Sequence, residues 1–214
     1  MKIAIVGAGI SGNTIAHLLH KEHKITVFEK NDRIGGHSHT HNIEIAGKAI
    51  SVDTGFIVFN KKTYPLFTSL LDKLKVDYEH SNMSFSVFSK LSGLEYNGTN
   101  LNTLFSQRKN LFNYKFIKMI FEILRFNKEA LELLIAKEEM TLGDYLVTNN
   151  YSDYFSKHYI LPMGSAIWSS NLKTMLNFPA KFFVKFFHNH GMLNINDRPQ
   201  WLTVTGGSES YVKK

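Results

Sequence analysis

The sequence predicts an α/β protein that begins with a Rossmann-like β-α-β unit and continues into a partial α+β domain. Three features near the N-terminus support this prediction. Residues 2–6 are a β-branched apolar run, residues 13–20 carry apolar side chains at helical spacing, and residues 25–28 resume a strand-like pattern. Together they have the length of one β-α-β unit, about 30 residues.

A glycine-rich turn joins the first expected strand to the helix. Its residues are Gly7, Ala8, Gly9, Ile10, Ser11 and Gly12. The first glycine permits a tight turn, the second lets the backbone approach a pyrophosphate, and the third lets the helix pack closely on the strand. Phosphates would lie at the helix N-terminus, where N–H groups and the helix dipole favour negative charge. A purely structural glycine turn is the alternative.

Glu29 follows the second expected strand, 22 residues after Gly7. A carboxylate at this place in a Rossmann unit accepts hydrogen bonds from the hydroxyls of an adenosine ribose. An acidic residue here also argues against a 2′-phosphate on the ligand. Strand, turn, helix and carboxylate therefore agree on dinucleotide binding.

The segment after Glu29 departs from a plain NAD site. It contains Lys30, Arg33, Gly35, Gly36 and His37. Paired glycines bring backbone close to a ligand, and an arginine can supply charge-assisted hydrogen bonds. In this segment the sequence resembles the flavin amine oxidase superfamily, with His37 where that superfamily usually has an arginine. The resemblance implies an FAD-binding domain of the glutathione-reductase type.

Residues 52–56 resemble the turn that in this superfamily closes the strand beside the flavin ring, which adds Gly55 and Phe56 to the expected cofactor-binding residues. A closer resemblance is to bacterial FAD-dependent oxidoreductases encoded beside cyclopropane fatty acid synthases. It rests on residues 35–40, 53–60, 151–155, 198–201 and 206–208. The cofactor-binding residues expected from the glycine turn and from the resemblance together are Gly7, Gly9, Ile10, Ser11, Gly12, Glu29, Lys30, Arg33, Gly35, Gly36, His37, Gly55 and Phe56.

The resemblance also implies a domain organisation. We expect the N-terminal part of the FAD domain at residues 1–60, a partial substrate domain, largely helical, at residues 61–200, and the start of a return to the FAD domain at residues 201–214. The chain resembles the N-terminal half of a longer protein, so a complementary C-terminal half is an expected partner.

The histidines at positions 37, 39 and 41 would share one face of a strand, as ligands of zinc or copper do. No suitably spaced acidic residue follows, so we expect no metal. We identify no catalytic residue, because in flavin oxidases the hydride chemistry belongs to the cofactor.

The remaining segments are expected to be mainly packing elements. Residues 62–75 and 113–139 have helical spacing, residues 83–87 alternate as in a strand, and Thr141 is placed to cap a helix. Residues 178–190 carry phenylalanines on one helical face and lysines on the other, which fits a core helix or one that contacts lipid. Trp168 and Trp201 are candidates for a pocket wall.

Composition excludes several classes of function. The 214-residue chain has no cysteine, so disulfides, thiolate metal sites and cysteine nucleophiles are excluded. Its formal charge of +7 comes mostly from scattered lysines, which is a weak nucleic-acid signature, so we expect no nucleic-acid partner. We expect a cytoplasmic protein, with the inner membrane face as a peripheral contact.

These observations favour an FAD-dependent oxidoreductase of amine oxidase type, which transfers hydride from an apolar or lipid-linked substrate to flavin and is a truncated form of a longer protein. The alternative is a non-catalytic nucleotide-binding fragment or subunit that needs a partner half. An NAD-dependent dehydrogenase is a third reading, and it leaves Gly35 and Gly36 without a role.

Overall fold

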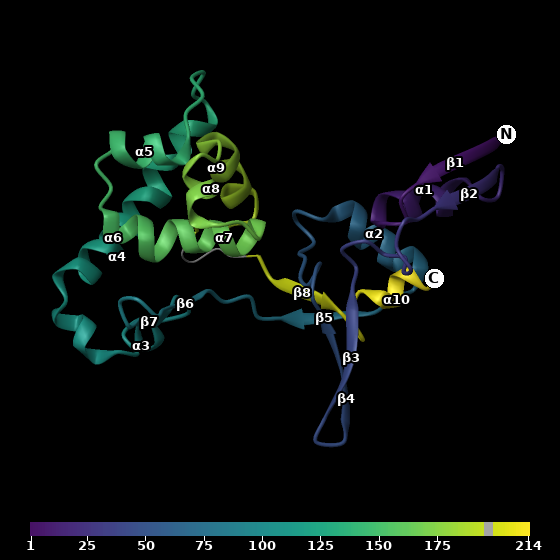
Figure 1. Cartoon of the computed structure of the whole chain (residues 1–214), viewed down its shortest axis with the longest axis horizontal. Coiled ribbons are helices and arrows are strands. Elements are labelled where there is room, and N and C mark those ends of the chain that lie inside the picture. Colours follow the sequence, from purple (N-terminus) through teal and green to yellow (C-terminus); the bar gives the residue numbers. More distant parts are fainter. Residues whose placement is uncertain (195–198) are drawn as a thin grey trace. The chain divides into compact units, whose positions relative to one another are not determined.

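The computed structural model describes residues 1–194 and 199–214, and its chain forms two compact units (Figure 1). The first unit comprises Met1–Met83 and Gln200–Lys214, and the second comprises Ser84–Pro199. The first unit thus continues past residue 60, the boundary expected from the sequence, because helix α2 and strand β5 pack within it. Arg198, part of the 198–201 motif, lies outside the described residues.

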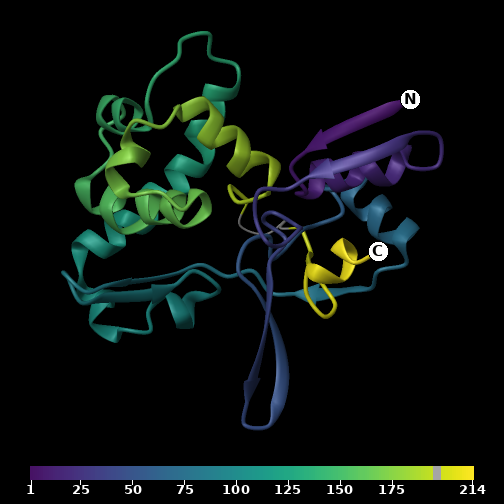
Figure 2. The ribbon, with the colours of Figure 1, turned by 45° about the vertical axis from the view of Figure 1, so that its right-hand side comes forward.

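The first unit opens with the predicted β-α-β arrangement. Strands β1 (Lys2–Val6) and β2 (Lys24–Phe28) pair in parallel, with Lys2 opposite Lys24 and Val6 opposite Phe28. Helix α1 (Ile10–Leu19) connects them and lies beside both strands (Figure 2). The helix begins inside the glycine turn, three residues earlier than its apolar spacing indicated.

An antiparallel hairpin follows, which the sequence analysis did not predict. Strands β3 (Thr40–Ile45) and β4 (Lys48–Asp53) extend as a two-stranded arm (Figures 1 and 2). Ala46 and Gly47 form the turn with φ angles of 50° and 75°. Two consecutive positive φ angles match the right-handed twist of hairpin strands, which explains the tight connection.

The first unit is completed by residues from both ends of the chain. Helix α2 (Pro65–Leu74) leads into strand β5 (Tyr78–Ser81), which pairs antiparallel with β8 (Trp201–Val204). A short helix, α10 (Glu209–Val212), follows β8. These elements share a small apolar core, whose buried members are Phe59, Leu71, Val76, Leu202, Val204 and Tyr211.

The second unit is mainly helical. Its elements are strands β6 (Ser86–Ser89) and β7 (Leu94–Asn97), helix α3 (Leu101–Leu104), 3-10 helix η1 (Arg108–Phe112), helix α4 (Tyr114–Glu129), 3-10 helix η2 (Ala130–Leu134), helices α5 (Leu142–Thr148) and α6 (Asp153–Phe155), π-helix η3 (Ser156–Ile160), and helices α7 (Leu161–Trp168), α8 (Leu172–Leu176) and α9 (Ala180–Asn189). Its core is rich in aromatic rings; Phe116, Phe126, Phe155 and Phe183 are each fully buried.

Several expectations for the second unit need correction. The helix expected over residues 113–139 ends at Glu129 and tightens into the 3-10 turn η2, a common way to terminate a helix. The strand expected over residues 83–87 starts only at Ser86. The expected cap at Thr141 is confirmed, because its hydroxyl accepts a 3.1 Å hydrogen bond from the Asp144 amide.

The phenylalanine-rich helix α9 is largely a core element. Phe183 and Phe187 are buried, whereas Phe182 is 55% exposed. Trp168 packs against the same helix, with its ring centroid 4.9 Å from that of Phe186. Within the residues that the structure describes, no helix combines the length and the apolar character needed to cross a bilayer.

Candidate functional site

The glycine turn between β1 and α1 closes through backbone contacts that only glycine permits. Gly7 has a φ of +96°, and its amide donates a 2.7 Å hydrogen bond to the carbonyl of Phe28. A Cβ atom on Gly12 would lie 1.9 Å from the Gly7 carbonyl oxygen. The first and third glycines therefore have the structural roles that the sequence predicts.

The N-terminus of α1 is available to an anion. Gly9 is the N-cap, and among the described residues no side chain caps the helix and no acid lies in its first turn. Ile10 and Ser11 are exposed in that turn. Since the first amides of a helix lack intrahelical partners, this end can receive phosphate oxygens.

Glu29 lies beside the turn and is anchored by two backbone amides. Its Oε2 accepts a 2.8 Å hydrogen bond from Ala8 N, and its Oε1 accepts a 2.9 Å bond from Asn31 N. Hydrogen bonds from the amides of Asn31 and Ala8 lower the pKa of this carboxyl below its ordinary value. Each oxygen keeps a second acceptor position, so an ionised Glu29 can still accept ribose hydroxyls.

The glycine pair Gly35 and Gly36 forms a second turn, which packs against the turn between β1 and α1. Gly35 donates a 2.7 Å hydrogen bond from its amide to the Ala8 carbonyl and pairs with Gly9. Gly36 has a φ of +60°, and a Cβ atom added there would lie 3.1 Å from the Gly9 Cα. The two turns thus form a shared backbone cradle, which any side chain at position 36 would crowd.

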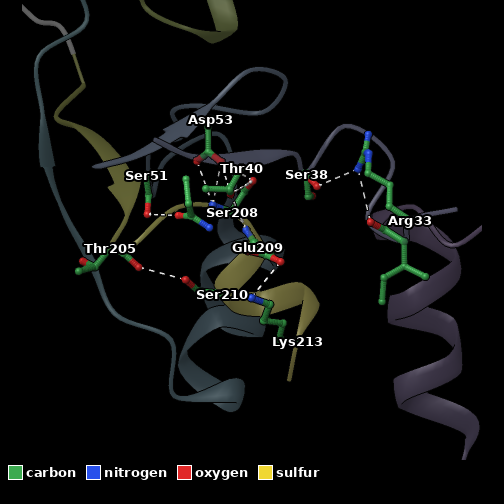
Figure 3. Close-up of polar contacts among 12 residues, drawn as sticks. Arg33, Ser38, Thr40, Ser51, Asp53, Thr205, Ser208, Glu209, Ser210 and Lys213 are labelled. Atoms are coloured by element: carbon green, nitrogen blue, oxygen red, sulfur yellow. Dashed lines mark hydrogen bonds and ion pairs between the residues drawn. The ribbon is translucent and has the colours of Figure 1, made fainter. Parts of the chain in front are cut away.

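Arg33 braces this second turn. Its guanidinium donates to the carbonyls of Gly36 at 2.6 Å and of Ser38 at 3.4 Å, and Figure 3 shows the contact with Ser38. The expected role of Arg33 was to supply charge-assisted hydrogen bonds in the cofactor-binding segment, which stays a prediction. In the structure the side chain bonds to turn carbonyls, while Lys30 and His37 are exposed beside the two turns.

The turn after β4 packs on the same segment. The amide of Phe56 donates a 2.9 Å bond to the His37 carbonyl, and a Cβ atom on Gly55 would lie 2.2 Å from that carbonyl oxygen. Phe56 itself points into the core, with its ring 5.2 Å from that of Phe67. Gly55 is therefore held against the backbone of His37, and Phe56 anchors the turn.

The three histidines do not share a strand face. Strand β3 starts only at Thr40, so His37 and His39 precede it. The rings of His39 and His41 lie 4.1 Å apart, and loss of solvent contact, with the nearby charge of Arg33, lowers the pKa of His39. Among the described residues, no group of three or more histidines or acids is placed to hold a metal.

Several residues outside the predicted set hold the site in shape. Asn13 donates a 3.0 Å bond from Nδ2 to the Ala8 carbonyl. Asp53 accepts hydrogen bonds from Thr40 Oγ1 at 2.5 Å and from Ser208 Oγ at 2.7 Å, as Figure 3 shows. Asn13 lies four residues after Gly9, so the sequence could have predicted that it faces the glycine turn from the first turn of the helix. The contact of Asp53 with Ser208 spans 155 residues and had no local signal.

The second unit carries two shallow depressions of about 400 Å³ and 410 Å³. Both are lined by residues of that unit alone and share Tyr154. Neither includes Trp168 or Trp201, the expected pocket-wall candidates. Trp168 packs among phenylalanines, and Trp201 is a buried residue of β8 in the first unit.

Comparison with known sequences matches the N-terminal region. A family model described as an NAD(P)-binding Rossmann-like domain matches residues 5–74. Over 55 residues the chain is 40% identical to the flavin-dependent L-tryptophan oxidase RebO of Lentzea aerocolonigenes. The aligned segment makes up 25% of this chain and 12% of that relative. The chain therefore has a Rossmann-like NAD(P)-binding domain within a mixed α/β fold.

Comparison with solved structures extends the likeness to the whole chain. Putrescine oxidase bound to putrescine superposes with a TM-score of 0.61 at 19% identity, over 100% of this chain and 49% of that one. Cyclohexylamine oxidase from Brevibacterium oxydans gives 0.60 at 17% identity, over 99% and 48%. These similarities show the fold alone, and the chain spans about half the length of these structures.

Proposed function

We propose that this chain forms the dinucleotide-binding part of an FAD-dependent oxidoreductase. The carrying observation is the close approach of Gly36 to Gly9 beside the anchored Glu29 carboxylate. A single glycine turn would suit any dinucleotide, whereas the second turn gives a role to the glycine pair. The similarity to a flavin-dependent oxidase over 55 residues supports FAD.

The residues divide the work of holding the cofactor. Glu29 binds the adenosine ribose hydroxyls, and the α1 amides with Gly9 and Gly36 receive the pyrophosphate. Arg33 keeps the second turn in shape through the carbonyls of Gly36 and Ser38. The exposed residues Ile10, Ser11, Lys30 and His37 border this path. When bound, the flavin supplies the hydride-accepting chemistry, so the chain needs no catalytic acid or base of its own.

The substrate proposal is an apolar or lipid-linked molecule, with an amine as the competing class. Phe182 on α9 supports the first class, because it presents an aromatic ring to solvent from a helix whose other face is buried. The oxidases of similar fold support the second. We also propose that a complementary polypeptide completes the protein, since the chain spans about half the length of those oxidases.

Anaerobic flavin reduction tests the proposal and separates the substrates. The chain is loaded with FAD and mixed in turn with a fatty acyl lipid, putrescine, cyclohexylamine and L-tryptophan, while flavin absorbance is followed. We expect bleaching by one class, and a smaller bleached fraction in the Gly12→Ala variant, which should retain less flavin. If no compound of either class reduces the bound flavin, even when a complementary half is present, the result would contradict the oxidoreductase proposal.

The non-catalytic alternative is not favoured by the comparisons, because the similar proteins are oxidases. It predicts flavin retention without reduction by any donor. An NAD-dependent dehydrogenase would instead reduce or oxidise a substrate with NAD in protein that carries no flavin.

A further inference from the structure

A buried hydroxyl pair connects the end of the chain to the second cofactor turn. The side chains of Ser38 and Tyr211 hydrogen-bond to each other although they are 173 residues apart. Each is 6% exposed. Tyr211 belongs to the small core of the first unit, where its ring lies 5.3 Å from that of Phe67. Since a buried hydroxyl without a partner is costly, each side chain fixes the other.

A second junction holds the same C-terminal segment in place. The carboxylate of Asp53 accepts bonds from the Ser208 amide at 2.9 Å and 3.0 Å and from its hydroxyl at 2.7 Å. Thr40 Oγ1 donates to Asp53 and accepts a 2.9 Å bond from the Glu209 amide. Figure 3 shows these residues together, joining the base of the β3–β4 hairpin to the start of α10. These hydrogen bonds therefore fix the start of α10, the helix that contains Tyr211.

From Ser38 a continuous series of hydrogen bonds reaches the ribose carboxylate. The Ser38 amide donates to the Gly35 carbonyl at 3.0 Å, and the Gly35 amide donates to the Ala8 carbonyl at 2.7 Å. The Ala8 amide in turn donates to Glu29 Oε2 at 2.8 Å. Both cofactor turns and the carboxylate thus lie on one path that begins at the Tyr211 hydroxyl.

Packing at the turn agrees with this path. A Cβ atom added to Gly35 would lie 3.4 Å from Val212 Cγ2, so α10 is in close contact with the turn itself. A Cβ atom on Gly207 would lie 2.5 Å from Thr40 Cγ2. The C-terminal segment therefore fits against the cofactor segment at several points.

We propose that Tyr211 is a positioning residue for the dinucleotide, which holds the Gly35–Gly36 turn in its binding geometry through Ser38. The assignment of FAD as the ligand rests on the proposed function, while the bracing of the turn does not. Tyr211 does not touch the ligand in this proposal. Its effect on affinity arises because an unbraced turn must be ordered when the ligand binds.

Hydrogen exchange of the ligand-free chain tests the brace alone. In Tyr211→Phe the ring stays in the core and only the hydroxyl is lost, so we expect the unit to remain folded. The amides of Gly35 and Ser38 should exchange roughly 5- to 10-fold faster, as the loss of one buried hydrogen bond predicts. Tyr78→Phe is the matched control, because its hydroxyl bonds to Asp72 on the surface of the same unit. Equal protection in Tyr211→Phe and the unmodified chain would overturn the proposal.

Equilibrium titration with FAD supplies the second readout. We expect roughly 5-fold weaker binding for Tyr211→Phe and for Ser38→Ala, and no further loss in the double variant, because both remove one contact. Additive losses, or unchanged affinity in the single variants, would contradict the positioning role. If the unmodified chain binds no FAD, the proposed function fails, and the exchange experiment still decides the brace.

Discussion

The two units of this chain differ in the size of their buried apolar cores. The helical unit surrounds a large aromatic core in which Phe116, Phe126 and Phe183 have no exposure. In the first unit, by contrast, Val6 on β1 is 89% exposed and Phe28 on β2 is 56% exposed. Parallel strands are ordinarily covered on both faces. The packing of its aromatic core therefore stabilises the helical unit, whereas strands β1 and β2 of the first unit leave apolar side chains exposed.

The first unit depends on specific contacts instead. Its two glycine-containing turns are held by glycine geometry, by the Arg33 guanidinium and by the Asp53 and Tyr211 hydrogen bonds, and its apolar core cluster has six buried members. Substitutions should therefore act differently in the two regions. Truncating a ring should unfold the helical unit, whereas single atoms should control ligand binding in the first unit.

The largest effect should come from a ring in the helical core. Phe183→Ala should destabilise the second unit by about 3–5 kcal/mol, because it removes a fully buried ring and leaves a cavity. Phe28→Ala is the matched change in the first unit and should cost less than about 1 kcal/mol, since much of that ring is already in water. Urea unfolding followed by circular dichroism measures both. Equal costs would contradict the contrast between the units.

A single methyl group should suffice to damage the dinucleotide site. Gly12→Ala places a Cβ atom 1.9 Å from the Gly7 carbonyl, so helix and turn must separate. Such overpacking costs about 1–3 kcal/mol, and a cost of that size carried into ligand binding weakens FAD binding roughly 5- to 150-fold. Gly98→Ala is the control, because its Cβ would have only an ordinary 3.7 Å contact. Fluorescence titration with FAD measures the difference, and similar affinities for both variants would sink the assigned geometry.

The Glu29 carboxylate, which we propose binds the ribose, should matter less than the turn but still measurably. Glu29→Gln keeps the shape and removes the charge, so we expect roughly 10-fold weaker FAD binding from the loss of charge-assisted bonds. Glu44→Gln on the exposed hairpin strand is the charge-matched control and should leave affinity unchanged. Isothermal titration at one ionic strength compares them. A loss that is equal in the two variants would point to net charge rather than to Glu29.

The smallest effect concerns acid pH. Because backbone amides lower the pKa of Glu29 in the folded chain, its ionised form contributes stability at pH values above the ordinary pKa of a glutamate. That contribution disappears as pH falls through the lowered folded pKa. FAD affinity should therefore stay level from neutral pH to about 5 and fall only below the ordinary glutamate range. A decline that starts near pH 6 would instead implicate a histidine.

Short-range features of the site could be predicted from the sequence. The spacing of Gly7, Gly9 and Gly12 and the position of Glu29 determine a β-α-β unit because each contact lies within one supersecondary element. The parallel pairing of β1 with β2 confirms that reading. The glycine pair at 35 and 36 was also recognisable, although its contact with Gly9 was not.

Long-range and orientation-dependent features could not be predicted. The Ser38–Tyr211 and Asp53–Ser208 contacts join segments more than 150 residues apart, and no periodicity encodes them. The direction of the Arg33 side chain depends on which carbonyls the turn leaves unpaired. The β3–β4 hairpin was missed although Ala46-Gly47 lies between alternating apolar runs, a pattern that could have revealed it. The cofactor roles of the thirteen expected residues, the link to cyclopropane fatty acid synthases and the expected partners stay predictions.

The central claim is that the first unit is built for FAD rather than for NAD. Its most direct test is a competitive equilibrium titration of the 214-residue chain with FAD, followed by flavin fluorescence, in the absence and presence of NAD. We predict saturable FAD binding that an equal concentration of NAD does not displace and that Gly12→Ala weakens at least roughly 5-fold. NAD binding as tight as FAD binding, or unchanged FAD affinity in Gly12→Ala, would contradict the account.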